Sequence, residues 1–123
     1  MKLNPECIRN ILLYIEEQPV GSEIMITEAL PPPLSHYAYP GLKAHVEQCA
    51  RAGFLYGYKL NILGEIKLSG LSPSGYKFLD DIRPDTVWEK TKSTASKVGS
   101  FSLDFLAKVA ANVTAELIKR HIN

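Results

Sequence analysis

The stretch from Leu42 to Phe54 constrains the fold more than any other part of the sequence, because its pattern is that of a helix that ends at a glycine and leads into a strand. At spacings of four, three and four residues, one apolar face is formed by Leu42, Val46, Cys49 and Gly53. The opposite face carries Ala44, Glu47, Gln48 and Arg51. This order of elements is the core of a winged helix, so we predict an α+β fold with a winged helix-turn-helix-like domain.

The residues before this unit predict a core helix followed by a short strand. Asn4 can cap the free amides of a helix that begins at Pro5 and runs to about Gln18, where residues 19–21 end it. Residues 22–26 place apolar side chains at a period of two, which predicts a strand that pairs with a later hairpin.

A full second helix is not expected between this strand and the helix that starts near Tyr39. Residues 27–30 can form one capped turn, but the prolines at 31–33 prevent a helix from continuing. In an ordinary helix-turn-helix, the recognition helix is held across a full preceding helix. Here that support must come from a single turn or from the loop that contains His36 and Tyr37, which is an argument against DNA binding.

The residues after the central helix predict a hairpin, which would be the wing. Residues 54–61 alternate in the manner of a half-buried strand. One side of this strand is formed by Phe54, Tyr56, Tyr58 and Leu60. Residues 61–65 supply a turn in which Gly64 is available for a positive φ, and residues 66–70 continue as the return strand.

Three more helices are predicted toward the end of the chain. The first covers residues 73–83, the second covers residues 84–98, and the last is capped by Ser102. We therefore divide the chain into a winged-helix-like domain in residues 1–83 and a C-terminal helical pair in residues 84–123.

The last helix has apolar positions at alternating spacings of three and four residues, which is typical of a helix that packs along its length against another helix. These positions are Leu103, Leu106, Ala110, Val113 and Leu117. The face either packs on the helix that contains Trp88 in the same chain or builds a homodimer. Both alternatives stay open, and the prediction of a homodimer depends on this helix.

The charge balance argues against a protein that coats nucleic acid. The 123 residues contain 14 Lys and Arg and 13 Asp and Glu, which gives a formal net charge of +1. A strong basic excess is the electrostatic signature of such proteins. Any DNA binding must therefore come from a local patch, and the length allows one compact core rather than two ordinary domains.

Two cysteines lie among apolar residues on predicted helices, and we expect Cys7 and Cys49 to be small buried core residues with reduced thiols. A disulfide or a metal site is the alternative. The sequence shows no secretory leader, no transit peptide and no run of about 18 or more apolar residues. We therefore expect a cytoplasmic protein that does not span a membrane.

Segments along nearly the whole chain resemble one family. They are NPECIRNILLYIEE (residues 4–17), HV (45–46), AGF (52–54), LSPSGYKFLD (71–80), IRPDTVWEKTK (82–92) and GSFSL (99–103). The chain resembles an uncharacterised group of short bacterial and prophage proteins with a predicted winged-helix fold. The resemblance implies that fold and a phage or mobile-element context, and it carries over no catalytic residue. Where the family usually has Tyr-His this chain has Ala44-His45, so no aromatic role is assigned there.

In our preferred hypothesis the protein binds duplex DNA, as a regulator encoded by a phage or mobile element. The residues expected at the groove are Lys43, Ala44, Gln48 and Arg51, and those expected on the phosphate backbone are Lys59 and Lys67. In the major groove, arginine suits guanine and glutamine suits adenine. Glu47 favours the alternative of a plain solvated helix face, because phosphates repel a carboxylate.

The competing hypothesis is a protein-interaction module. The predicted wing tip carries Ile62 and Leu63, apolar residues that gain nothing from a phosphate backbone and are better buried against a protein. The near-zero net charge, Glu47 and the missing second helix favour this hypothesis as well. The partner would be a host or phage protein.

No enzymatic activity is predicted, because the sequence has no Gly-rich phosphate loop and no Ser-His-Asp or Cys-His arrangement at a suitable spacing. We expect no cofactor and no metal. His45 lies at the edge of the apolar helix face, where it is either a hydrogen-bonded packing residue or a phosphate contact. Asp80, Asp81 and Asp85 are expected to be a solvated helix end.

Overall fold

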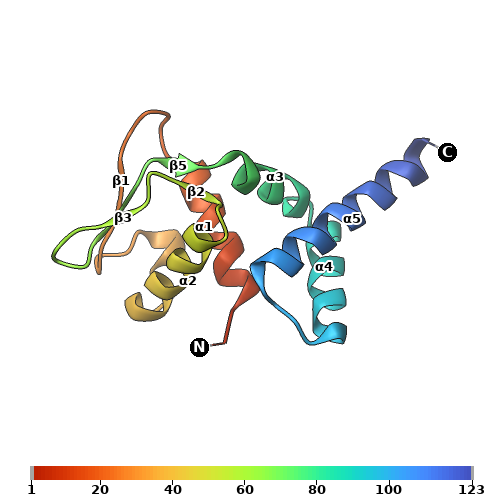
Figure 1. The fold of residues 1–123 in the computed structure, drawn as a ribbon, viewed down its shortest axis with the longest axis horizontal. Coiled ribbons are helices and arrows are strands. Elements are labelled where there is room, and N and C mark those ends of the chain that lie inside the picture. The colour runs from red at the N-terminus through yellow and green to blue at the C-terminus, as the bar shows by residue number, and fades with distance from the viewer. Residues whose placement is uncertain (1, 123) are drawn as a thin grey trace.

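The computed structural model describes residues 2–122 and has the mixed α+β composition that the sequence predicts. In chain order the elements are α1 (Pro5–Glu16), β1 (Ile24–Ile26), the 3₁₀ helix η1 (Pro32–Leu34), α2 (Tyr39–Arg51), β2 (Leu55–Tyr56), β3 (Lys59–Leu60), β4 (Ile66–Leu68), β5 (Gly70–Leu71), α3 (Pro73–Ile82), α4 (Asp85–Val98) and α5 (Leu103–Ile122). The strands and α2 lie at one end of the molecule, α4 and α5 at the other, and α1 and α3 between them (Figure 1).

The strands form two small antiparallel sheets, and β4 is the central strand of the larger one. Its neighbours are β1 and β3, while β2 pairs with β5. The strand after the first helix thus pairs with the second strand of the hairpin, which is the order expected for a winged helix. The predicted pairing of the early strand with the hairpin is confirmed, although the strand begins at Ile24.

Helix α1 begins where its cap chemistry predicts. The Asn4 side chain accepts hydrogen bonds from the backbone N–H groups of Glu6, at 3.0 Å, and Cys7, at 3.4 Å, and a proline occupies the first turn. The helix ends at Glu16, two residues before the predicted Gln18. Its buried stripe is formed by Cys7, Ile8, Ile11, Leu12 and Ile15. This stripe forms the centre of the core.

A short turn replaces the second helix of an ordinary helix-turn-helix, as the prolines predict. The Thr27 hydroxyl accepts a hydrogen bond from the Ala29 N–H at 3.2 Å, which closes a turn without starting a helix. Leu34 of η1 is fully buried, and the hydroxyl of Tyr37 accepts a hydrogen bond from the Asn10 side chain of α1 at 2.8 Å. One 3₁₀ turn and its loop, held against α1, therefore precede α2.

The prediction of one continuous alternating strand over residues 54–61 is wrong. The chain turns at Gly57, whose φ is +72° and where a Cβ would lie 2.4 Å from the hydroxyl oxygen of Ser69. This turn splits the segment into β2 and β3, so a period of two no longer describes its faces. Phe54 is buried, whereas Tyr56 is 67% exposed and Leu60 47%.

The apolar face of α2 ends with the helix, so placing Gly53 on that face is also wrong. Gly53 is exposed and adopts a φ of +81° just after the last helical turn. The residues of the helix that are buried are Leu42, His45, Val46 and Cys49. A helical spacing cannot be extended past Arg51, because the chain there leaves the helical conformation.

The predicted interacting face of α5 packs within the same chain. Leu103, Leu106, Ala110 and Val113 are buried, and Leu117 packs beside Val87 of α4. Helix α5 lies against α4 and α3 (Figure 1). Packing within the chain is therefore the alternative that the structure bears out for the four buried residues, while Leu117 is only partly buried and the homodimer stays a prediction.

One apolar core continues across the boundary predicted at residue 83. Trp88, Leu106 and Ala110 belong to the same buried cluster as the stripe of α1. The Trp88 indole N–H donates a hydrogen bond to Glu6 at 2.9 Å, and the cations of Arg9 and Lys92 lie 5.6 Å and 5.3 Å from its ring centroid. The helical extension is thereby joined firmly to α1.

Candidate interaction surface

The turn between β3 and β4, residues 61–65, is called the wing turn and is organised by Asn61. Its side-chain oxygen accepts hydrogen bonds from the backbone N–H groups of Leu63 and Glu65, each at 2.9 Å, and its amide donates to the Glu65 carboxylate at 2.8 Å. Gly64 supplies the positive φ of +79° that the sequence predicts for this turn. The turn therefore presents its remaining side chains in fixed positions.

The apolar wing tip, which consists of Ile62 and Leu63, projects into solvent. Ile62 is fully exposed and Leu63 is 80% exposed. Full burial of one aliphatic side chain of this size stabilises by about 1.5–3 kcal/mol, so leaving two neighbours uncovered forgoes a substantial gain. Exposed apolar neighbours on an ordered turn are typical of contact sites for proteins.

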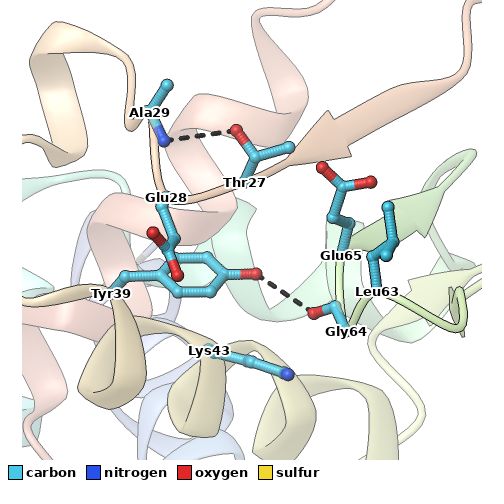
Figure 2. Close-up of a pocket in the computed structure, with 8 residues that line it drawn as sticks. All are labelled: Thr27, Glu28, Ala29, Tyr39, Lys43, Leu63, Gly64 and Glu65. Carbon is cyan, nitrogen blue, oxygen red and sulfur yellow. Dashed lines mark hydrogen bonds between the residues drawn. The ribbon is translucent and has the colours of Figure 1, made fainter.

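A cavity of about 390 Å³ lies between this turn, the loop after β1 and the first turns of α2 (Figure 2). It is lined by Thr27, Glu28, Ala29, Tyr39, Lys43, Leu63, Gly64 and Glu65. The Tyr39 hydroxyl is 3.3 Å from the carbonyl oxygen of Gly64 and 3.4 Å from that of Ile26, and it can donate to either. Tyr39 thus connects α2 to both the wing turn and β1.

Two carboxylates line this cavity. Figure 2 shows Glu28 over the Tyr39 ring in this view and Glu65 past the hydroxyl group of Tyr39, next to Leu63, with Lys43 running along α2 below Gly64. Burial raises the pKa of Tyr39, and the negative charges of Glu28 and Glu65 raise it further. The Lys43 ammonium nitrogen lies 3.0 Å from where a Cβ on Gly64 would be, so it sits directly under the wing turn.

The outer face of α2 carries the predicted base-reading residues, and one of them is already paired. Arg51 forms an ion pair with the Glu47 carboxylate, at 2.6 Å and one helical turn away. Burial raises the pKa of the adjacent Tyr58; Glu47 raises it further, and Arg51 lowers it. Gln48, like Ala44, is only partly exposed. The predicted residues share one face, but a carboxylate occupies the middle of it.

The two wing lysines lie side by side on the exposed face of the larger sheet. Lys59 of β3 and Lys67 of β4 are direct cross-strand partners, and Met25 of β1 follows in the same row. Lys67 also has Glu23 within 3.7 Å. The sequence placed both lysines at the wing, but their direct opposition depends on the strand register.

His45 is a packing residue, as the simpler of its two interpretations predicts. It is 6% exposed; one ring nitrogen, Nδ1, donates to the Gly41 carbonyl at 2.7 Å, and Nε2 accepts from the Asn4 N–H at 2.9 Å. Both ring nitrogens are therefore used inside the protein, and the phosphate contact is excluded. Cys7 and Cys49 are buried free thiols in the core, which confirms that prediction.

The solvated acidic helix end is only partly confirmed. Asp80 and Asp85 are exposed, but Asp81 is 7% exposed and accepts a hydrogen bond from Lys77 at 2.6 Å. It lies on the inner side of α3, where the helix packs on its neighbours. Sequence proximity grouped three carboxylates, of which Asp80 and Asp81 lie on different sides of α3 and Asp85 begins α4.

Charges of both signs are balanced on the surface formed by α2 and the wing. The cations predicted to contact DNA are Lys43, Arg51, Lys59 and Lys67. The carboxylates that accompany them are Glu23, Glu28, Glu47 and Glu65. Sequence reasoning missed the cavity residues Glu28 and Glu65, because only the folded chain brings the loop after β1 to the wing turn. The surface formed by α2 and the wing therefore has no net positive charge that would attract a polyanion.

Comparisons with known proteins give a family and no activity. A family model described as "Hypothetical protein (DUF2513)" matches residues 2–102. An uncharacterized protein of Haemophilus influenzae is 31% identical over 121 residues, which cover 96% of this chain and 99% of that protein. No solved structure matches. Across residues 2–122, no helix is both long enough and apolar enough to cross a membrane.

Proposed function

This chain belongs to the family described as "Hypothetical protein (DUF2513)", and we propose that it is a protein-interaction module that binds its partner with the wing turn. The exposure of the apolar wing tip is the observation that carries this proposal. The Asn61 hydrogen bonds support it, because a contact held in place before binding loses little conformational entropy when the partner arrives.

The energy available from the wing tip is sufficient for a specific contact. Burying Ile62 and Leu63 contributes at most about 3–6 kcal/mol, on the scale of about 1.5–3 kcal/mol for each buried aliphatic side chain. Part of this offsets the entropy lost on association. A few residues of this kind at the centre of an interface supply most of its binding energy.

The charges on the surface of α2 and the wing favour a protein over duplex DNA as the binding partner. A phosphate backbone needs an excess of cations, since its affinity comes from the counterions that Lys and Arg release. The surface of α2 and the wing instead balances its lysines and arginine with Glu23, Glu28, Glu47 and Glu65. A protein partner can present both signs of charge in matching positions.

The test compares immobilised wild-type protein with the double variant Ile62→Ser/Leu63→Ser and with Val20→Ser. Val20 is a matched control, because it is also fully exposed and lies on the turn after α1. A protein from a lysate of the source organism should be retained by wild type and Val20→Ser and lost by the double variant.

The retained protein, once purified, should bind the double variant about a hundredfold more weakly than wild type, which corresponds to roughly 3 kcal/mol of lost burial. Equal affinity for wild type and the double variant would remove the wing tip from the proposal. Circular dichroism should show all three proteins equally folded, because the substituted side chains are exposed.

A second candidate is DNA binding by a regulator encoded by a phage or mobile element, and one observation favours it. Lys59 and Lys67 face each other across β3 and β4, where like charges in direct opposition destabilise a sheet. Glu23, 3.7 Å from Lys67, offsets one of the two charges, and a phosphate would offset the other. In this candidate the two lysines hold the phosphate backbone, while Lys43, Gln48 and Arg51 meet the groove.

Binding to mixed genomic fragments at two salt concentrations tests this second candidate. Lys59→Gln should weaken binding to all sequences alike, and Arg51→Ala should lower it by about 1–3 kcal/mol in a base-dependent manner. An absence of binding at low salt would end the DNA candidate and leave the protein-interaction proposal intact.

A further inference from the structure

The cavity beside the wing turn has the chemistry of a socket for one cationic side chain. Resting on the proposed function, we propose that it takes an arginine side chain of the partner protein, next to an apolar partner residue that covers the wing tip. The volume of about 390 Å³ accommodates a guanidinium group and the methylene groups that lead to it.

Three groups in the cavity suit a guanidinium together. The ring of Tyr39 lines the cavity, and two carboxylates come to it from different segments, Glu28 near the ring and Glu65 past its hydroxyl group (Figure 2). A planar guanidinium can stack on such a ring and donate paired hydrogen bonds to a carboxylate. Lysine has a compact, strongly hydrated ammonium group and fits this arrangement less well.

Both carboxylates retain acceptors for an incoming donor. Within residues 2–122, the Glu28 carboxylate takes part in no hydrogen bond or ion pair, and the residue is exposed and lines the cavity. Glu65 uses one oxygen to accept from Asn61, which orients the carboxylate and leaves its second oxygen unused in the same part of the chain. The acceptors are thus placed before the partner arrives.

Leu63 connects the socket to the wing tip. It lines the cavity and is also 80% exposed, so one partner segment can cover it and enter the cavity at the same time. The partner chemistry that fits is therefore an arginine beside an aliphatic or aromatic residue. The apolar contact supplies affinity, and the carboxylates select the charge.

The charge of Lys43 allows one variant to distinguish arginine binding from DNA binding. Its ammonium group lines the same cavity and repels a guanidinium, so removing its charge should strengthen arginine binding. The same change should weaken DNA binding and reduce the salt dependence by about one counterion. Lys43→Met therefore has opposite effects on the two occupants.

The experiment is a titration of ¹⁵N-labelled full-length protein with acetyl-Leu-Arg-Leu-amide, followed by the amide signals in NMR spectra. The matched probe is the peptide with citrulline in place of arginine, which keeps the shape and loses the charge. The arginine peptide should shift the amides of Glu28, Ala29, Gly64 and Glu65 with a dissociation constant on the order of millimolar, and the citrulline peptide should bind about tenfold more weakly.

Variants separate the socket from general charge attraction. Glu28→Gln and Glu65→Gln should each weaken the arginine peptide about tenfold, and Lys43→Met should tighten it severalfold. Gln at position 65 can still accept from Asn61, so the turn stays in place. Equal binding of both peptides, or shifts confined to other carboxylates such as Asp80 and Asp85, would overturn the arginine inference.

The two proposals can fail separately. If the arginine peptide does not bind but Ile62→Ser/Leu63→Ser still abolishes partner binding, the wing tip remains the contact and the socket is wrong. If the peptide binds and the purified partner is indifferent to the wing-tip variant, the proposed function fails while the cavity keeps its selectivity.

Discussion

Two glycines occupy the same place in two helices, and replacing each with alanine should change stability in opposite directions. Gly41 is the third residue of α2 and Gly75 the third residue of α3. In both cases alanine is the better helix former, by about 0.5–1 kcal/mol. The surroundings of each glycine therefore decide whether the substitution raises or lowers the free energy of unfolding.

The space around Gly75 is already filled by backbone. A Cβ there would lie 2.2 Å from the carbonyl oxygen of Phe54, 3.0 Å from its carbonyl carbon and 3.2 Å from its Cα. That oxygen also accepts a hydrogen bond from the Ser72 N–H at 2.9 Å, so moving it away strains the start of α3. Overpacking costs about 1–3 kcal/mol and a weakened hydrogen bond about 1 kcal/mol, which exceeds the gain in helix propensity.

We expect Gly75→Ala to lower the free energy of unfolding by about 1–3 kcal/mol, after the gain in propensity is subtracted. Gly41→Ala should raise it by about 0.5–1 kcal/mol, because within residues 2–122 no atom beyond its chain neighbours and the nearby backbone of α2 lies within 4 Å of the added methyl group. Urea titration followed by circular dichroism measures both changes, and thermal unfolding should shift by about 3–6 °C for each kcal/mol. A Gly75→Ala protein as stable as Gly41→Ala would refute the close contact between α3 and Phe54.

Three further outcomes follow from the core and its ion pairs. Burial raises the pKa of Glu6, but hydrogen bonds from Lys92 and Trp88 outweigh it and leave that pKa below its usual value. The stability that this group contributes is complete above the unfolded pKa and is lost as pH falls through the folded pKa. The free energy of unfolding should therefore fall more steeply between about pH 5 and pH 3 for wild type than for Glu6→Gln. Burial raises the pKa of Cys7 to about 11 and that of Cys49 as well, so a thiol reagent at pH 8 should label neither residue until urea is added. His45→Ala should lower the free energy of unfolding by about 2–4 kcal/mol in a urea titration, since it removes two hydrogen bonds and buried volume; unchanged stability would contradict the packing role.

Features with a local physical cause could be predicted from the sequence. The start of α1 follows from the Asn4 cap and Pro5, and its buried stripe follows from helical periodicity. The wing turn follows from Gly64, which supplies the positive φ, and the absence of a full second helix follows from the prolines at 31–33. Each of these depends on residues within one or two turns of each other.

The features that the sequence did not predict depend on contacts between distant segments. The break of the predicted first wing strand, residues 54–61, depends on Ser69 beside Gly57, and the cavity depends on Glu28 beside the wing turn. The apolar spacing of α5 identified an interacting face but not the surface that covers it. A helix that packs within its own chain and a helix that packs on a second copy need the same apolar spacing.

The carboxylates on the surface of α2 and the wing discriminate between a DNA partner and a protein partner better than the ion pair of any one cation does. An exposed ion pair such as Arg51–Glu47 contributes only about 0.3–0.5 kcal/mol, so a duplex could open it easily and free Arg51 for a guanine. Glu47 would then be left facing phosphates, as would Glu28 and Glu65 at the other end of the helix. A protein partner can match each carboxylate with a cation and cover the apolar wing tip, so the groups that oppose a duplex become contacts for a protein.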